Sequence, residues 1–206
     1  MLSVGLTFES RVAARAGAGL VGPNAVIQLA EALRAEPGAA EQVFGRAGFI
    51  RLLRSPPDAM IDETIPARLF EALWREFTPG SAARFAREAG RRTGAYVLAN
   101  RIPGVARLIL RSLPPRLAAP LLLRAIRRNA WTFAGSGDCR VVPGQPALVS
   151  ITDNPLAMPG GAWHVGVFEQ LFDALVCPGP RVTYSACRID SRPTCRFTIE
   201  WAAGLR

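Results

Sequence analysis

Residues 181–201 read RVTYSACRIDSRPTCRFTIEW, and this run indicates the kind of fold to expect. Its first eight and last eight residues are rich in β-branched and aromatic side chains, and a polar segment separates them. This composition is typical of an antiparallel β-hairpin with a short loop. A loop centred on Ser191 places Cys187 opposite Cys195 on the buried side of the sheet. At that separation the two thiols could share a metal ion, form a cross-strand disulfide or simply pack.

The chain is long enough to bury a full hydrophobic core. Half of its 206 residues are hydrophobic, which favours a single domain, and we assign that domain to residues 22–206 and an N-terminal arm to residues 1–21. The arm contains Gly17 to Gly22, which match the dinucleotide-binding pattern GxGxxG. That pattern binds a cofactor only where a buried strand feeds the turn, and the preceding SRVAARA is no such strand, so we expect no nucleotide site there.

All 25 basic residues are arginines, and with 16 acidic residues they give the chain a formal charge of +9. This balance favours an anionic partner, whether nucleic acid, membrane headgroups or a ligand that carries a carboxylate. The arginines recur singly or in pairs, without a dense basic stripe or a known nucleic-acid-binding module. We therefore expect no nucleic-acid partner.

No segment of the sequence has the pattern of a transmembrane helix. The longest uncharged run, residues 154–168, is broken by prolines and glycines and is shorter than the ~18 apolar residues that a spanning helix needs. The first residues, MLSVGLTFES, lack the basic leader of a secretion signal. These features predict a cytoplasmic protein, in which cysteines are more often thiols or metal ligands than disulfides.

The first half of the chain has a helical period. Apolar residues recur at helical spacing after Pro23 and after Pro66, and further helices are expected over residues 39–47 and up to about Asn100. Residues 102–133 are strongly apolar yet carry many arginines, and prolines at 114, 115 and 120 divide them into short segments. They form either a pair of core helices or an apolar groove, rimmed by positive charge, for a flat ligand with an acidic tail.

The second half changes to a strand period. Residues 139–142 and 147–152 resemble short strands, and an amphipathic helix that includes Phe168 precedes the final hairpin. The resulting order is strand, strand, helix, strand, strand. We expect an α+β fold with helices on one face of an antiparallel sheet.

Several segments resemble bacteriochlorophyll-biosynthesis proteins of the J type, the so-called 4-vinyl or 8-vinyl reductase family. The resemblance covers about residues 22–201 and lies in the segments GPNAVIQLAEAL, AMIDE, REAGRRTGAYVLANRIP, RNAWTFAGSG and the hairpin that ends in TCRF. It implies a dimeric α+β ligand-binding fold like that of TRAPP vesicle-tethering subunits, tetrapyrrole ligands and a role in making bacteriochlorophyll.

The chemistry of a vinyl reduction requires a source of hydride or electrons. The sequence has no credible nucleotide-binding pattern, and its four cysteines include no CxxC pair. We therefore interpret the chain as a non-catalytic carrier of magnesium-tetrapyrrole intermediates, of the magnesium protoporphyrin or divinyl protochlorophyllide type. The alternatives are a divinyl (proto)chlorophyllide 4-vinyl/8-vinyl reductase, and a scaffold that docks on a partner or on a membrane surface through residues 102–133. Expected partners are pathway enzymes such as magnesium chelatase or a methyltransferase, and a second copy of the chain.

The candidate ligand-binding residues are His164, Trp163, Phe168, Trp131, Arg127 and Arg128. His164 is the only histidine, and neutral imidazole could supply an axial ligand to magnesium in a tetrapyrrole. The alternative is a helix-start residue satisfied by backbone or water. Sensor relatives hold zinc with cysteines of this hairpin, so the resemblance implies a zinc ion at Cys187 and Cys195. Because no carboxylate stands just before Cys187, we favour packed thiols without metal.

Overall fold

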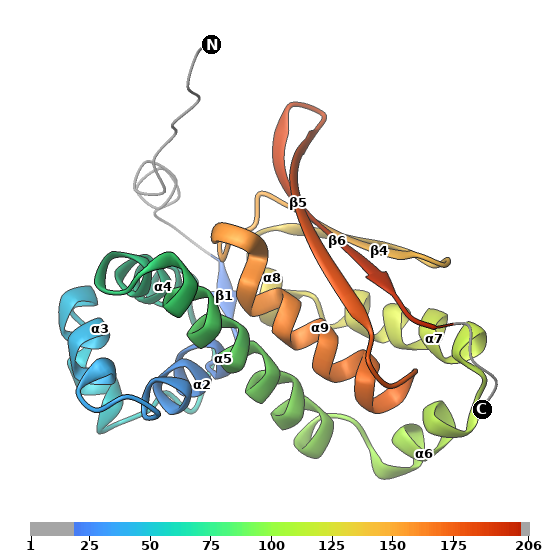
Figure 1. Cartoon of the computed structure of the whole chain (residues 1–206), viewed down its shortest axis with the longest axis horizontal. Coiled ribbons are helices and arrows are strands. Elements are labelled where there is room, and N and C mark those ends of the chain that lie inside the picture. Colours follow the sequence, from blue (N-terminus) through green and yellow to red (C-terminus); the bar gives the residue numbers. More distant parts are fainter. Residues whose placement is uncertain (1–18, 203–206) are drawn as a thin grey trace.

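The computed structural model describes residues 19–202, which form an α+β fold (Figure 1). The first part of the chain is helical, and a four-stranded antiparallel sheet with the order β3-β4-β6-β5 follows it. The early elements are α2 (Asn24–Leu33), α3 (Ala39–Ala47), η1 (Ile50–Leu53), α4 (Thr64–Glu76) and α5 (Pro79–Asn100). None of the helices within residues 19–202 combines the length and the hydropathy needed to cross a bilayer.

The described chain opens with a small two-stranded ribbon. Strand β1 (Leu20–Val21) pairs with β2 (Ile61–Asp62), and the side chain of Val21 is fully buried. The last two residues of the expected arm therefore belong to the domain, while residues 1–18 lie outside the described part. Strand β1 lies inside the glycine pattern, whose first two residues, Gly17 and Ala18, are outside the described part.

The helical half follows the apolar pattern of the sequence. Helix α3 spans the nine residues expected of it, and Leu69, Phe70 and Leu73 of α4 are buried as the stripe predicted. Helix α5 begins at Pro79, where the Thr78 hydroxyl accepts a hydrogen bond from the Ser81 amide at 3.4 Å. A proline in the first turn costs no hydrogen bond, because that amide has no partner within the helix.

The arginine-rich segment forms α6 (Gly104–Ser112), α7 (Pro115–Arg128) and the short α8 (Trp131–Ala134). Pro114 and Pro115 separate α6 from α7, as expected. The further division expected at Pro120 is wrong, because α7 continues through it. The ring removes only the amide that would bond the Arg116 carbonyl, and α7 still buries Leu122, Leu123 and Ile126 within the next two turns.

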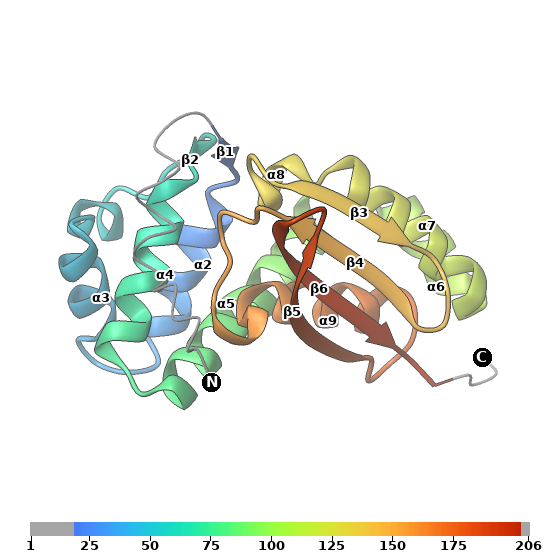
Figure 2. The ribbon, with the colours of Figure 1, turned by 90° about the horizontal axis from the view of Figure 1, so that it is seen from above.

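The sheet half has the expected order of strand, strand, helix, strand, strand. Helix α9 packs against β5, α7 packs against β3, and the helices cover one face of the sheet (Figure 2). The elements are β3 (Asp138–Val142), β4 (Ala147–Thr152), η2 (Pro159–Gly161), α9 (Ala162–Leu175), β5 (Arg181–Ile189) and β6 (Arg192–Glu200).

The register of the β5–β6 hairpin differs from the expected one by a single residue. Ala186 lies opposite Cys195, and Cys187 lies opposite Thr194. The turn consists of two residues, Asp190 and Ser191, with φ of 49° and 62°, the left-handed values that a type I′ turn requires. Our prediction that Cys187 faces Cys195 is therefore wrong, and the one-residue slip sends their side chains to opposite faces of the sheet.

Helices α5 and α9 approach each other through glycines. A Cβ atom added at Gly90 would overlap the Trp163 carbonyl, and one added at Gly166 would overlap the Arg87 carbonyl. At Gly94 the added atom would lie 2.7 Å from the Cβ of Gln170. The two backbones can lie this close only because none of the three positions carries a side chain.

We expect Gly166→Ala to destabilise the fold by about 1–3 kcal/mol, because the added methyl group pushes the two backbones apart. The matched control is Gly45→Ala in α3, where a Cβ atom meets nothing within 4 Å. That change should be neutral or stabilising, by up to about 1 kcal/mol. Urea unfolding of both variants measures the difference, and equal effects would contradict the close helix contact.

Candidate functional site

A groove of about 600 Å³ lies between α5, the start of α9 and strand β5. This volume is in the usual range for small-molecule sites, about 300–1,000 Å³. One side is a row of arginines on α5, and the rest of the lining is mostly apolar. The lining residues are Gly80, Ala83, Arg84, Arg87, Glu88, Arg91, Pro159, Gly160, Ala162, Val165, Val182 and Tyr184.

Arg87 is held in place by a buried carboxylate. It donates to both oxygens of Glu169 on α9, with the Nε–Oε2 distance at 2.8 Å, and Glu169 is only 6% exposed. The hydrogen bond to Glu169 raises the pKa of the Arg87 guanidinium, and partial burial acts in the opposite direction. This bidentate pair ties α5 to α9 at the point where the glycines meet.

Arg84 and Arg91 are not held by a close carboxylate as Arg87 is. Within the described residues Arg84 has no hydrogen-bond or ion-pair partner and lies over the ring of Phe85, with 5.2 Å from its Cζ to the centroid. Arg91 has only a 4.0 Å approach to Glu169, and Glu88 is neutralised by Arg92 at 2.8 Å. Two turns of helix separate Arg84 from Arg91, which is about 10 Å. The groove therefore offers two positive charges to an incoming anion.

The opposite wall depends on a glycine at the start of α9. Gly161 has φ of 57°, and a Cβ atom there would lie 2.5 Å from Tyr184 and 2.6 Å from Phe197. A residue with a side chain would be strained and would also push the loop away from the sheet. Tyr184 packs on Phe197 with ring centroids 5.6 Å apart. The loop and the strand thus form one continuous apolar surface beside the arginines.

His164 lies in an aromatic cluster behind this wall. Its ring centroid is 4.9 Å from that of Trp163, 5.3 Å from Phe197, 6.2 Å from Phe133 and 6.3 Å from Phe168. The imidazole is 1% exposed, and neither ring nitrogen has a hydrogen-bond partner of normal geometry. Burial lowers the pKa of His164 to about 3, although the nearby Phe133 backbone acts weakly the other way. The ring is therefore neutral at physiological pH.

The structure brings together three of the six residues that the sequence singled out as ligand-binding. Trp163, His164 and Phe168 share the aromatic cluster, whereas Trp131 is 57% exposed and makes no ring contact with it in the described part. Arg127 and Arg128 lie exposed in the last turn of α7. Burial raises the pKa of the Cys139 thiol to about 12, and the charge of Asp138 acts in the same direction. The charge of Arg127 opposes both effects.

The two hairpin cysteines do not meet at one site. In the observed register Cys195 is buried on the helix-covered face, and Cys187 is half-buried on the other. Among residues 19–202 there is no group of three or more His, Cys, Asp or Glu that could hold a metal ion. The structure therefore does not assemble the zinc site that the resemblance implied.

Sequence reasoning missed the arginine face of α5 and the tyrosine of β5. The i, i+4 spacing of Arg84, Glu88 and Arg92 is typical of ordinary helix support, and the structure pairs Glu88 with Arg92 but not with Arg84. The available signal was the spacing of Arg84, Arg87 and Arg91, which puts them on one helix face. No local pattern could connect them to Tyr184, because that wall comes from a strand far along the chain.

Comparison with known proteins identifies the family. The bacteriochlorophyll synthase 23 kDa chain of Cereibacter sphaeroides is 43% identical over 187 residues, which cover 87% of this chain and 89% of the relative. The protein of the same name from Rhodobacter capsulatus is 38% identical over 192 residues, 87% of this chain and 86% of the relative. The chain belongs to this family. The resemblance to bacteriochlorophyll-biosynthesis proteins seen in the sequence is thus confirmed, although no family model matches the chain.

Solved structures that resemble this member of the 23 kDa chain family are H-NOX domains. A Cs H-NOX mutant and an isoleucine-to-phenylalanine mutant of T. tengcongensis H-NOX each superpose with a TM-score of 0.53, at 11% and 9% identity. Each match covers 87% of this chain and 96% of the other. At this identity the likeness concerns the fold alone. The α+β class is confirmed, and these neighbours do not show the expected likeness to TRAPP subunits in particular.

We expect the stability of the protein to fall as the pH drops from about 6.5 towards 3, partly because of His164. The unfolded chain binds a proton on this histidine near its reference pKa, but the folded chain does not until about pH 3. The free energy of unfolding therefore falls by up to about 1.4 kcal/mol for each unit by which the pH drops in this window. Urea unfolding of wild type and His164→Leu at several pH values isolates this contribution, because the variant lacks it. A constant difference between the two proteins would contradict burial of the imidazole.

Proposed function

We propose that this protein binds magnesium-tetrapyrrole intermediates of bacteriochlorophyll biosynthesis and carries them between enzymes of the pathway. The intermediates are of the magnesium protoporphyrin or divinyl protochlorophyllide type. Family membership supports the pathway. The groove between α5, α9 and β5 is the observation that carries the proposal for binding, because it combines an apolar lining with a row of arginines.

The chemistry of the groove suits a large apolar ring with acidic side chains. Ala83, Val165 and Val182 would contact the faces or edges of the macrocycle, and Tyr184 adds an aromatic surface. Arg84 and Arg91 would pair with carboxylates of the ligand, for which the planar guanidinium is well matched. Arg87 already binds Glu169, so it would hold the wall in position rather than bind the ligand.

The aromatic cluster around His164 is the alternative position for the ligand that has to be weighed against the groove. The neutral imidazole has one nitrogen lone pair, neither ring nitrogen has a hydrogen-bond partner of normal geometry, and the lone pair could coordinate magnesium. Ala162 and Val165 line the groove but His164 does not, and four aromatic rings surround the imidazole. Axial ligation would require these packed rings to move apart. We therefore place the ligand in the groove and assign His164 a packing role.

A carrier needs only to bind and release its ligand, whereas a vinyl reductase must also add two electrons and two protons. The groove supports the first task directly through shape and charge. The reductase alternative would also require a reductant, such as a nicotinamide cofactor, bound beside the ligand. A carrier would receive its magnesium-containing ligand from an enzyme such as magnesium chelatase and pass it to one such as a methyltransferase.

Titration with magnesium protoporphyrin tests the proposal. We expect a shift of the Soret band, with saturation at one ligand per chain and quenching of tryptophan fluorescence. Arg84→Ala combined with Arg91→Ala should weaken binding about tenfold or more, because each substitution removes a charge-assisted hydrogen bond. The matched control is Arg51→Ala with Arg54→Ala, two exposed arginines outside the groove, which should bind as wild type does.

Two results would contradict the proposal. Equal affinity in the groove variant, the control and wild type would place the ligand elsewhere. Loss of the vinyl signal of a divinyl substrate, stoichiometric with NADPH and catalysed by the protein alone, would establish the reductase instead of the carrier.

A further inference from the structure

The excess positive charge of this chain is concentrated in one segment. Residues 89–137 contain nine arginines and no acidic residue. The formal charge of the whole chain is also +9, so the other 16 arginines are balanced by the 16 acidic residues. The segment comprises the second half of α5 together with α6, α7 and α8.

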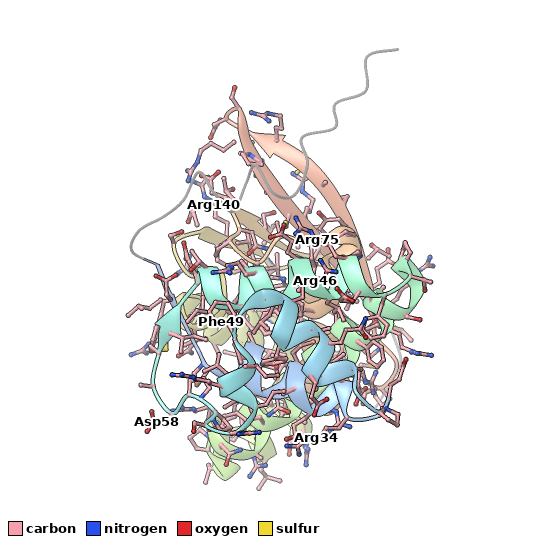
Figure 3. All side chains as sticks on the ribbon, turned by 90° about the vertical axis from the view of Figure 1, so that its left-hand side faces the viewer. Arg34, Arg46, Phe49, Asp58, Arg75 and Arg140 are labelled. Atoms are coloured by element: carbon pink, nitrogen blue, oxygen red, sulfur yellow. The ribbon has the colours of Figure 1, made fainter. Side chains whose placement is uncertain are left out.

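The fold separates this charge from the rest of the molecule. Helices α6 and α7 lie side by side at one end, and α3 and α4 lie at the other (Figures 1 and 2). Three arginines at the α3–α4 end, which are labelled in Figure 3, have acidic partners: Arg34 pairs with Glu31, Arg46 with Glu76 and Arg75 with Glu71. In the described part of the chain no ion pair is made by Arg107, Arg116, Arg124, Arg127 or Arg128.

The same two helices expose large apolar side chains. Helix α6 leaves Val105 71%, Leu108 67% and Ile109 51% exposed, and this spacing places the three on one face of the helix. On α7, Leu117 is 51% and Leu121 49% exposed. These five side chains, with the arginines of α6 and α7, form what we call the basic–apolar end.

Helix α6 is attached to the rest of the fold by a buried side chain, a hydrogen bond and contacts with two helices. Leu110 is its single buried residue, and Arg111 donates from Nε to the Ala174 carbonyl at the end of α9, at 3.0 Å. The helix also contacts α7 and α9. Its apolar face is thus presented outward by a fixed scaffold, and a face of this kind commonly marks an interaction surface.

We propose that the basic–apolar end docks on the surface of an anionic lipid bilayer. An amphipathic helix lies in a membrane interface with its apolar side chains among the acyl chains and its arginines at the headgroups. The long arginine side chains can extend to phosphates while their methylene groups stay in apolar surroundings. Attraction to anionic lipid is worth about fivefold in affinity for each basic residue near the surface, so several unpaired arginines give a large effect.

Charge complementarity favours a bilayer over a second copy of this chain. A symmetric dimer through this end would bring two copies of the acid-free segment, residues 89–137, against each other, so that arginines would face arginines. Like charges without counter-charges oppose such an association. An anionic bilayer supplies the missing negative charge and an apolar layer together. The proposal does not depend on tetrapyrrole binding, since the groove lies elsewhere, between α5, α9 and β5.

Co-sedimentation of the full chain, without tetrapyrrole, tests the proposal with vesicles of phosphatidylglycerol and phosphatidylcholine. We expect binding to these vesicles, little binding to pure phosphatidylcholine, and weakening as salt is added. Leu108→Ser with Ile109→Ser should weaken binding more than tenfold, because both side chains would no longer insert. Arg124→Gln with Arg128→Gln should weaken it by a similar factor. All four residues are exposed, so the variants should keep the wild-type circular dichroism and melting temperature.

The matched control is Leu20→Ser with Ile50→Ser, which removes two apolar side chains that are 55% and 46% exposed outside the basic–apolar end. It should bind vesicles as wild type does. Absence of binding to anionic vesicles, or binding that survives Leu108→Ser with Ile109→Ser, would overturn the proposal. A wild-type dimer that Leu108→Ser with Ile109→Ser dissociates, without vesicle binding by either protein, would assign the surface to self-association and also overturn it.

Discussion

The close contact between α5 and α9 is the constraint on which the rest of the structure depends. Gly90, Gly94 and Gly166 let the two backbones meet without intervening side chains. Helix α9 also lies against the sheet, so the contact fixes the helical half relative to the strands. Protein interiors are packed as densely as organic crystals, and an extra methyl group at such a contact must displace a whole element. Gly90, Gly94 and Gly166 therefore lie where this approach leaves no room for a side chain.

The same contact creates the site. It brings the arginine face of α5 next to the first turn of α9, where Gly161 keeps the loop close to Tyr184. The pair between Arg87 and Glu169 then links the two helices electrostatically. On the other side of α9, His164 is sealed among aromatic rings. One helix thus separates a solvent-open groove with charged walls from a closed apolar core, and only the groove has the charge to attract an anionic ligand from water.

The distribution of charge gives the molecule two distinct surfaces. Ion pairs neutralise Arg46 on α3 and Arg75 on α4, whereas residues 89–137, which include α6 and α7, contain no acidic residue. Large apolar side chains exposed together on one surface commonly mark an interaction site, which suggests that a partner normally covers them. For a carrier of poorly soluble pigments, a groove and a separate docking surface would serve different steps. The ligand could be held in one place while the protein is positioned by the other.

Much of the fold could be predicted from local patterns. Helical spacing located α3 and α4, and the change to a strand period gave the order of the sheet half. The hairpin register was missed by one residue, because its turn depends on left-handed backbone at Asp190 and Ser191, two residues that are not glycine. The helix contact was missed because glycine in a helical pattern indicates only weak helix propensity. The close approach that glycine permits can be recognised only once the neighbouring helix is known.

The candidate site was harder to predict than the fold. Trp163, His164 and Phe168 do cluster, because they lie within the first two turns of α9, where the rings of His164 and Phe168 pack on Phe197 of the sheet. The groove joins α5, α9 and β5, and no periodicity reports which distant segments become neighbours. Conversely, Arg127 and Arg128 were chosen for their place in an apolar stretch, but they lie on its exposed side.

A crystal structure of the complex with magnesium protoporphyrin tests the central claim most directly. The account predicts that the macrocycle lies in the groove against Val165 and Tyr184, with its carboxylates paired to Arg84 and Arg91 and with the His164 ring still enclosed. A macrocycle inside the aromatic cluster with magnesium bonded to His164, or one bound on the exposed side of α6 and α7, would contradict it.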